Sequence, residues 1–581
     1  MQGEARQGHD TQHNSPQEEL TQAAADAVAP ETGLLGPLDP QWIASSLAPM
    51  TAGLQQHWEQ ATQVLLQYTA DAARLALPVN GETAEGAECP AEPAPSDKRF
   101  RDAAWTDNPY FRALGQGYLL WVRMMEDLVD AAGLEAQAHE RARFAARAVT
   151  DACAPTNFFW TNPEALRRAV ETQGESVVQG LRNFVSDLEE NGGRPRQVDT
   201  SPFLLGQNLA ATPGGVVYRN DLMELIQYEP RTETVHEVPL LVSPPWINKY
   251  YILDLAPGRS FVEWAVEHGH TVFAISYRNP DATARDWSLD DYLLNGPHIA
   301  LDVIADITGC EEVNIAALCV GGTLTAMLAA WLAEAGEKRI RSLTLLNTLL
   351  DFDDPGALGL FTDSESVDRL VQVMSEKGYL EASTMAGTFD VLRANDLIWN
   401  YVSRNWLLGE SPPAFDILTW NYDSTRLPAA LHAFYLRACY VQNRLARGVL
   451  ELGGLPIRLD AVTSDTFVVA AQNDHIVPWR SAYRATQLLA GDVTFVLTSS
   501  GHIAGVVNPP NDKSRHWTAE HSPKDPDAWL TVANEQRGTW WETWAQWAAT
   551  RSGGRRPPPP LGSTTYPPGD RAPGAYVHEK S

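Results

Sequence analysis

The chain has 581 residues, of which 44% are hydrophobic, so it is long enough to form two or more domains around a large core. Its 44 Lys and Arg against 73 Asp and Glu give a net charge of -29, which excludes a predominantly basic surface, and we expect no nucleic-acid partner. No apolar run approaches the ~20 residues that span a bilayer and no leader pattern opens the chain, so we expect a cytoplasmic protein without a transmembrane segment.

The cysteines are few, scattered and odd in number. None belongs to a CxxC pair, and none has a neighbouring His at the spacing of a zinc site. We therefore expect neither disulfides nor a metal. The five are Cys89, Cys153, Cys310, Cys319 and Cys439.

The first 200 residues divide into two segments. Residues 1–95 are rich in Gln, Ala, Glu and Pro and lack sustained periodicity, which predicts a mostly disordered tail. Residues 96–200 predict a helical domain, because apolar residues recur at three- and four-residue steps after the helix-start signal Asn108-Pro109.

Residues 201–550 alternate short β-rich runs with helical segments. Strands that are apolar on both faces and separated by helices are typical of a parallel sheet covered on both sides. We therefore expect an α/β catalytic domain. The predicted strands are 238–243, 271–277, 312–318, 340–347, 465–471 and 493–499.

Two further segments complete the predicted organisation. The gap between the strands at 340–347 and 465–471 is too long for a loop, so we expect an aromatic-rich cap subdomain inserted at about 352–450. Residues 551–581 are rich in Pro, which cannot continue a helix, and they predict an extended C-terminal tail.

The stretch "ALCVGG" places Cys319 between a predicted strand and a predicted helix. This is the setting of a nucleophile elbow, in which small neighbours let strand and helix pass close together. The amides at the helix start favour a thiolate there. From this stretch alone, a buried structural cysteine is an equally good interpretation.

The order of residues along the chain adds to the catalytic interpretation. Asp474 and His502 each follow a predicted strand, and Cys, Asp, His is the order of the α/β-hydrolase triad. We predict that His502 removes the thiol proton and that Asp474 orients His502. The alternatives are a helix cap for Asp474 and an ordinary loop residue for His502, while His475 is a competing base of secondary rank.

Fold analogy also predicts the oxyanion hole. In α/β hydrolases it comprises the amide after the nucleophile, here Val320, and one amide from the loop after an earlier strand. That second donor is expected near Trp246, Ile247 and Asn248, and we assign it to Ile247.

Several longer stretches carry a family resemblance over roughly residues 100–550. The chain resembles the polyhydroxyalkanoate synthases, and within them the single-subunit, short-chain type (class I). The stretches that carry it include "SPFLLGQNLAATPGGVVYRN", "PPWINKYYILDLAPGRS", "LCVGGTL", "FDILTWNYDSTRLP", "QNDHIVPW" and "SSGHIAGVVNPP".

The resemblance implies an α/β-hydrolase fold, with cap and helical N-terminal domain, and an acyltransferase. The enzyme would polymerise (R)-3-hydroxyacyl-CoA, most simply 3-hydroxybutyryl-CoA, into a polyester through a cysteine thioester and release CoA. Cys319, Asp474 and His502 match the family's catalytic residues. It further implies a homodimer attached to the polymer granule and no cofactor, since coenzyme A belongs to substrate and product.

Two residues depart from the family pattern and keep alternatives open. Ala317 stands where a Gly is usual, and Trp246 replaces a smaller residue, so the indole either narrows the acyl channel or packs as an ordinary aromatic.

Two alternative functions stay open. One is a thiol hydrolase of the same fold, such as a polyester depolymerase or thioesterase. The other, suggested by Ala317 and Trp246, is an inactive granule-binding paralogue.

Overall fold

The computed structural model describes residues 40–76, 91–94 and 97–581, which fold into two compact units. Unit 1 holds the described residues up to Gln197 together with Arg393–Pro412, and unit 2 holds Val198–Leu392 and Pro413–Ser581. None of the helices in the described ranges combines the length and apolarity that crossing a bilayer requires.

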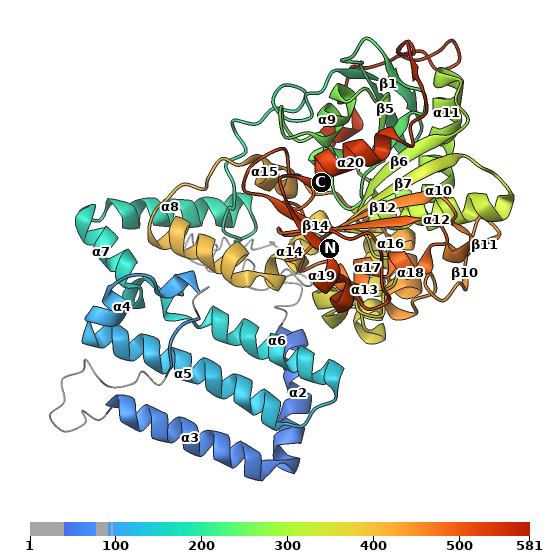
Figure 1. Ribbon diagram of the computed structural model, residues 1–581. Coiled ribbons are helices and arrows are strands. Elements are labelled where there is room, and N and C mark those ends of the chain that lie inside the picture. The colour runs from blue at the N-terminus through green and yellow to red at the C-terminus, as the bar shows by residue number, and fades with distance from the viewer. Residues whose placement is uncertain (1–39, 77–90, 95–96) are drawn as a thin grey trace, which may run out of the picture. The chain divides into compact units, whose positions relative to one another are not determined.

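Unit 2 is built on a ten-stranded sheet in the order β1-β2-β5-β4-β6-β7-β12-β13-β14-β15 (Figure 1). Its six central strands, β5 to β13 in that order, are parallel, and antiparallel pairs flank them on both edges. The strands are β1 (Gly214–Arg219), β2 (Met223–Tyr228), β4 (Leu240–Ser243), β5 (Val272–Tyr277), β6 (Val313–Leu318), β7 (Ile340–Leu346), β12 (Asp465–Ala471), β13 (Val493–Thr498), β14 (Arg515–Thr518) and β15 (Asn534–Arg537).

Each predicted strand of the parallel sheet is confirmed to within two residues at its ends. All residues of β4, β5 and β6 are buried, which explains why these strands read as continuous apolar runs and not as alternating ones. The flanking strands β1, β2, β14 and β15 were not among the predicted strands, because their sequences are more polar or shorter.

The sheet separates two apolar cores. Neighbouring residues of one strand enter different cores, as Leu241 and Val242 do, because successive side chains point to opposite faces. One core is closed by α10 (Leu289–Leu293), α11 (Ile299–Thr308), α12 (Val320–Ala335) and α17 (Trp479–Tyr483), and the other by α9 (Phe261–Glu267) and α20 (Trp540–Ala549).

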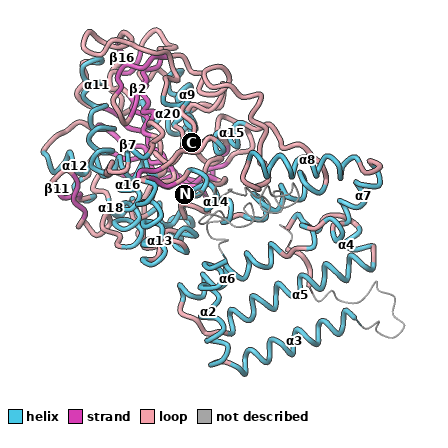
Figure 2. Tube along the Cα trace, turned by 180° about the vertical axis from the view of Figure 1, so that it is seen from behind, coloured by secondary structure: helices cyan, strands magenta, loops and turns pink. Residues whose placement is uncertain are grey.

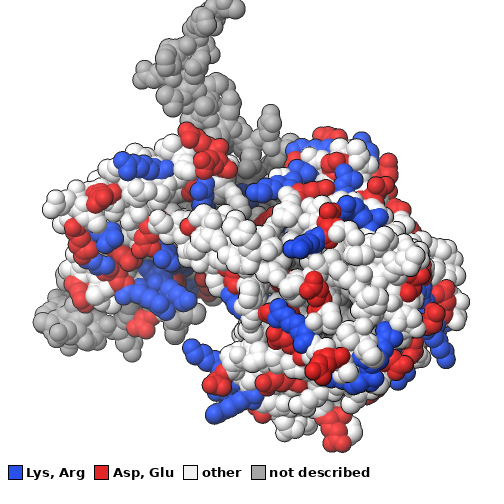
Figure 3. Space-filling model, turned by 90° about the horizontal axis from the view of Figure 1, so that it is seen from above, with Lys and Arg blue, Asp and Glu red and all other residues white. Residues whose placement is uncertain are grey.

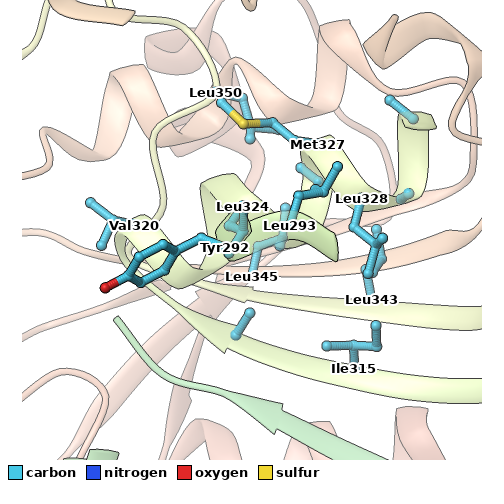
Figure 4. Packing of buried hydrophobic residues seen from close by; sticks show 14 of the residues in the cluster. Tyr292, Leu293, Ile315, Val320, Leu324, Met327, Leu328, Leu343, Leu345 and Leu350 are labelled. Atoms are coloured by element: carbon cyan, nitrogen blue, oxygen red, sulfur yellow. The ribbon is translucent and has the colours of Figure 1, made fainter. Parts of the chain in front are cut away.

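The helix α12 lies directly on the sheet and is buried on nearly all sides. Figure 4 shows Leu324, Met327 and Leu328 of this helix packed with Leu343 and Leu345 of β7. A helix that is apolar all round is a core helix, so α12 provides a rigid support for the residue that precedes it. That residue is Cys319.

Unit 1 is helical, as predicted, and Asn108 caps α5 by accepting from the amide of Tyr110 at 3.0 Å. Its core contains Met50, Val129 and Ala142. The helices are α2 (Pro40–Gln56), α3 (Trp58–Ala76), α4 (Ala104–Asp107), α5 (Pro109–Ala131), α6 (Ala136–Ala152), α7 (Pro163–Glu171) and α8 (Glu175–Glu190) (Figure 2).

The predicted disordered tail over residues 1–95 is wrong for residues 40–76. They form α2 and α3, and α2 contributes Trp42 and Met50 to the packing of unit 1. The amphipathic spacing is weak in α2, although not in α3. The close contact at Gly53, whose added Cβ would lie 2.2 Å from the carbonyl oxygen of Ala132, is a tertiary feature that the sequence does not show. Residues 1–39 and 77–90 of the predicted tail lie outside the described residues.

The predicted cap at about 352–450 is not a single body. Residues 393–412 belong to unit 1, whereas the rest packs in unit 2. The described elements of this insertion in unit 2 include α13 (Ser364–Lys377), α14 (Ala382–Leu392), α15 (Asp416–Tyr422) and α16 (Ala429–Tyr435).

The C-terminal segment 551–581 is extended as predicted, but it is not a free tail. Its strand β16 (Arg555–Arg556) pairs with β3 (Val235–His236), and Val577 is buried. Two short helices come before this segment in the chain, α18 (Ala485–Leu488) and α19 (Pro526–Val532). A Pro-rich chain retains its carbonyls as acceptors, so it can be held by side chains of the domain without forming a helix.

The net negative charge is not gathered in one place on the face shown in Figure 3. Lys and Arg lie there among Asp and Glu, with uncharged surface between them.

Candidate active site

Cys319 occupies a strained turn between β6 and α12. Its φ and ψ of 53° and -125° lie in a region that non-glycine residues rarely adopt. Its amide donates to the carbonyl of Leu346 at 2.9 Å, and its own carbonyl accepts from the amides of Gly322 and Thr323. The backbone thus matches the nucleophile elbow that the sequence predicts, with the cysteine half-buried at the start of α12.

The two positions after Cys319 require glycine, because neighbouring atoms occupy the space that a Cβ would need. A Cβ on Gly321 would lie 2.4 Å from the carbonyl oxygen of Pro244, and one on Gly322 would lie 2.0 Å from Oγ1 of Thr348. Ala317, in contrast, is a fully buried strand residue that pairs with Ser243 of β4. The methyl group at this position is therefore accommodated inside the sheet.

Asp474 and His502 lie together at the ends of β12 and β13. Nδ1 of His502 is 2.6 Å from Oδ2 of Asp474, and Oδ1 of Asp474 accepts from the amides of Ile476 and Val477 at 2.8 and 2.9 Å. The side chain of Asp474 has no exposed surface, so both of its oxygens are used inside the protein. Asp474 thus bonds Nδ1 of His502 with one oxygen and the backbone of its own loop with the other.

The surroundings of His502 raise the pKa of its imidazole to about 10. Burial acts first and lowers the pKa, but the charge and hydrogen bond of Asp474 and the contact with the Cys319 sulfur more than offset it. Because Nδ1 is bound to Asp474, Nε2 is the ring atom left to face the thiol. The structure therefore brings Cys319, His502 and Asp474 into one connected set.

Asn347 is a site residue that the sequence analysis did not identify. It follows β7 with φ of 42°, is fully buried, and donates from Nδ2 to the carbonyl oxygen of His502. Its amide donates to Val469 at 2.8 Å. An Asn as the last residue of the predicted strand 340–347 was the available signal, since Asn tolerates a positive φ better than most residues.

Comparison with known proteins identifies the family. The model for the poly-beta-hydroxybutyrate polymerase (PhaC) N-terminus matches residues 96–265, and the model for the alpha/beta hydrolase fold matches residues 248–509. The poly(3-hydroxyalkanoate) polymerase of Methylorubrum extorquens is 44% identical over 495 residues, which cover 84% of this chain and 82% of that protein. The chain belongs to the poly(3-hydroxyalkanoate) polymerase family.

Other members of the polymerase family give similar values. The polymerase subunit PhaC of Rhizobium meliloti is 43% identical over 507 residues, covering 86% of this chain and 82% of that protein. The subunit PhaC of Cupriavidus necator is 43% identical over 493 residues, covering 84% and 83%. The predicted resemblance and the predicted α/β-hydrolase fold are thus confirmed.

Solved structures of α/β hydrolases add little to this. The monoacylglycerol lipase of Paleococcus ferrophilus covers 57% of this chain and 99% of its own at 12% identity, with a TM-score of 0.32. A structural likeness with so low a TM-score supports no conclusion about this chain.

The oxyanion donors that fold analogy assigns to this polymerase remain predictions. Val320 supplies the first amide of α12, which has no partner within its helix. Ile247 lies in the loop after β4 and packs with Cys319 against the same core. Since β4 and β6 are hydrogen-bonded neighbours, their ends bring this loop to the elbow.

Three aromatic residues of the insertion form a group near Cys319 in this member of the polymerase family. Tyr435 and Tyr440 lie 5.6 Å apart, centroid to centroid, and Phe352 is 6.0 and 5.0 Å from them. Burial, more than any other cause, raises the pKa of both tyrosine hydroxyls. The sequence analysis located these aromatics in the insertion but assigned them no role, because their meeting point depends on tertiary folding.

Trp246 lies at the edge of this aromatic group. Only 3% of it is exposed, and its ring is 5.6 Å from that of Tyr435 and 5.7 Å from that of Tyr292. The indole is thus a buried packing aromatic, and its effect on the acyl channel stays a prediction.

Proposed function

We propose that this protein polymerises (R)-3-hydroxyacyl-CoA into a polyester and releases CoA. The observation that carries the proposal is the connected set Cys319, His502 and Asp474 on a nucleophile elbow, in a chain that belongs to the poly(3-hydroxyalkanoate) polymerases. These three residues fit acyl transfer through a covalent intermediate.

The first step forms an acyl-enzyme. Nε2 of His502 takes the proton of the Cys319 thiol, and the thiolate attacks the thioester carbonyl of the substrate. The amides of Val320 and Ile247 are the proposed donors to the resulting oxyanion. When the C–S bond to CoA breaks, the imidazolium returns its proton to the leaving thiolate, so that CoA departs as the thiol.

The second step extends the polymer. Nε2 of His502 takes the proton of a 3-hydroxyl group, whose oxygen attacks the thioester on Cys319 and forms an ester bond. The sulfur of Cys319 leaves and recovers its proton from the imidazolium. Exchange between two thioesters is nearly isoenergetic, which explains why a cysteine suits repeated acyl transfer better than a serine would.

The contacts of Asp474 support an orienting role. Both of its oxygens are taken by His502, Ile476 and Val477, and its side chain is fully enclosed. An incoming 3-hydroxyl cannot reach this carboxylate, because the side chain of Asp474 has no exposed surface. We therefore assign activation of the hydroxyl to His502, with Asp474 stabilising the imidazolium.

The remaining parts of the proposal rest on the family. We infer that the monomer is short, with 3-hydroxybutyryl-CoA as the first candidate, and that the enzyme acts in the cytoplasm as a homodimer on the granule surface. It needs no cofactor, because the substrate carries its own CoA.

The test is CoA release from (R)-3-hydroxybutyryl-CoA by the purified protein and by Cys319→Ala, with analysis of the acyl product. Polymer formation that depends on Cys319 is the expected result. Free 3-hydroxybutyrate would replace the proposal by thiol hydrolysis. If no CoA is released from 3-hydroxyacyl-CoA of any chain length, the protein would be assigned as the inactive granule-binding paralogue.

A further inference from the structure

Lys249 carries a buried ammonium group in unit 2, three residues after Trp246. Only 2% of the residue is exposed, and Nζ donates to the backbone carbonyls of Glu579 at 2.5 Å and Tyr576 at 3.3 Å. Burying a charge is costly unless hydrogen bonds and opposite charges compensate for it. The last residues of the chain therefore supply contacts that Lys249 requires.

The C-terminal peptide is itself held in one place. The carboxylate of Glu224 accepts from the amides of Ala575 and Tyr576 at 2.9 and 3.1 Å. The carboxylate of Glu579 accepts from the amide of Asn279 at 3.0 Å. With these anchors the carbonyls that face Lys249 are fixed to β2 and to the loop after β5.

The segment that contains Lys249 is also held by Trp420 of α15 and by Thr425, which follows this helix. Nε1 of Trp420 donates to the carbonyl oxygen of Lys249 at 2.7 Å, and Oγ1 of Thr425 donates to that of Ile247 at 2.5 Å. In Figures 1 and 2 the C-terminus lies close to α15. The segment Trp246–Lys249 is thus clamped between the stretch 420–425 and the end of the chain.

The end of β4, which leads into this clamped segment, touches the nucleophile elbow. The carbonyl of Pro244 would lie 2.4 Å from a Cβ on Gly321, and Ser243 pairs with Ala317 two residues before Cys319. A displacement of the segment would therefore move its amides relative to the thiol. Hydrogen-bond donors to an oxyanion act only when they are held at the position where the charge develops.

We propose that Lys249 is a positioning residue, which together with the terminal peptide Ala575–Ser581 holds the segment Trp246–Lys249 so that the amide of Ile247 faces the acyl carbonyl on Cys319. This inference rests on the proposed acyl transfer and adds a role for the end of the chain. Lys249 acts through the backbone and does not touch the substrate.

The experiment compares Lys249→Met with wild type in two reactions of the same thiol. Acyl transfer from 3-hydroxybutyryl-CoA passes through an oxyanion, whereas alkylation of Cys319 by iodoacetamide does not. We expect kcat for CoA release to fall by about 10-fold or more with KM changed by less than about 3-fold, and the alkylation rate to stay within about 2-fold. Lys338→Met, an exposed lysine of unit 2, is the matched control.

A second variant removes the peptide. Ending the chain after Gly574 is expected to lower kcat as Lys249→Met does, and the added synthetic peptide of residues 575–581 is expected to restore at least part of it. A peptide of the same composition in scrambled order is the control. A protein with both Lys249→Met and the truncation is expected to have a kcat no lower than that of either single change, because both changes remove the same interaction.

The outcomes separate the two proposals. Full CoA release by Lys249→Met, or by the truncated chain, would overturn the positioning role while leaving the polymerase proposal in place. Equal losses of acyl transfer and alkylation would also overturn it, since they would indicate general damage to the fold. A wild-type protein that forms no Cys319-dependent acyl product would overturn the proposed function itself.

Discussion

Nδ1 of His502 lies 2.6 Å from Oδ2 of Asp474, and the carboxylate side of this pair is fully buried. The bond fixes which ring nitrogen faces Cys319. It also places a full negative charge beside the imidazole in a site where water does not screen it, so the pair sets both the orientation and the charge of the proposed base.

Replacing Asp474 by Asn should separate these effects. The amide has the shape of the carboxylate but no charge, so we expect the pKa of His502 to fall far below about 10, because burial alone lowers it. We expect kcat for CoA release to drop roughly 10³-fold or more. NMR titration of the His502 ring checks the first point and steady-state kinetics the second. An unchanged kcat would rule out the orienting role.

The raised pKa of His502 also predicts how stability depends on pH. Its folded pKa of about 10 exceeds the ordinary value of 6.5, so its contribution to the free energy of unfolding is fully present below pH 6.5 and is lost as pH rises towards 10. Urea midpoints between pH 6.5 and 10 should fall more steeply for wild type than for His502→Gln. Parallel curves would contradict the assignment.

The elbow glycines should be far less tolerant than Ala317. Gly321→Ala forces a Cβ to within 2.4 Å of a backbone oxygen, and we expect it to cost about 1–3 kcal/mol of unfolding free energy and most of the activity. Ala317→Gly removes a methyl group and creates no such overlap. We expect it to lower the free energy of unfolding by about 1 kcal/mol and to leave the activity intact. Chemical denaturation and CoA release measured on both variants test the contrast.

Trp246 should influence which monomer is accepted. Trp246→Ala removes an indole that borders the aromatic group above Cys319, so the ratio of kcat/KM for 3-hydroxyhexanoyl-CoA to that for 3-hydroxybutyryl-CoA is expected to rise about 10-fold. Because the indole is buried, the variant should also lose about 3–5 kcal/mol of stability. Trp246→Phe is the control, and an unchanged ratio in the Ala variant would assign the indole to packing alone.

Asn347 should matter through His502. Asn347→Gly retains a residue that adopts its positive φ but removes the amide that donates to the His502 carbonyl. We expect both kcat and the rate of Cys319 alkylation to fall about 10-fold, because the imidazole that serves both reactions is displaced. This pattern differs from that expected of Lys249→Met, in which alkylation is retained.

Much of the catalytic unit could be predicted from local pattern. Continuous apolar runs and the helices between them predicted all six parallel strands, since burial on both faces leaves a signal in the sequence itself. The turn residues at the strand ends then predicted Cys319, Asp474 and His502 as neighbours, because parallel strands end at one edge of a sheet. The family-specific stretches predicted the polymerase family.

Other features depended on residues far apart in the chain. The helices at 40–76 were missed because the composition of residues 1–95, rich in Gln, Ala, Glu and Pro, favoured a disordered tail, and they are held by packing against α5 and α6. The C-terminal segment has no sustained helix or strand pattern, and contacts with distant residues such as Glu224, Lys249 and the strand β3 hold it in place. Local sequence determines which faces must be buried, whereas the partner of each polar group is decided when distant segments meet.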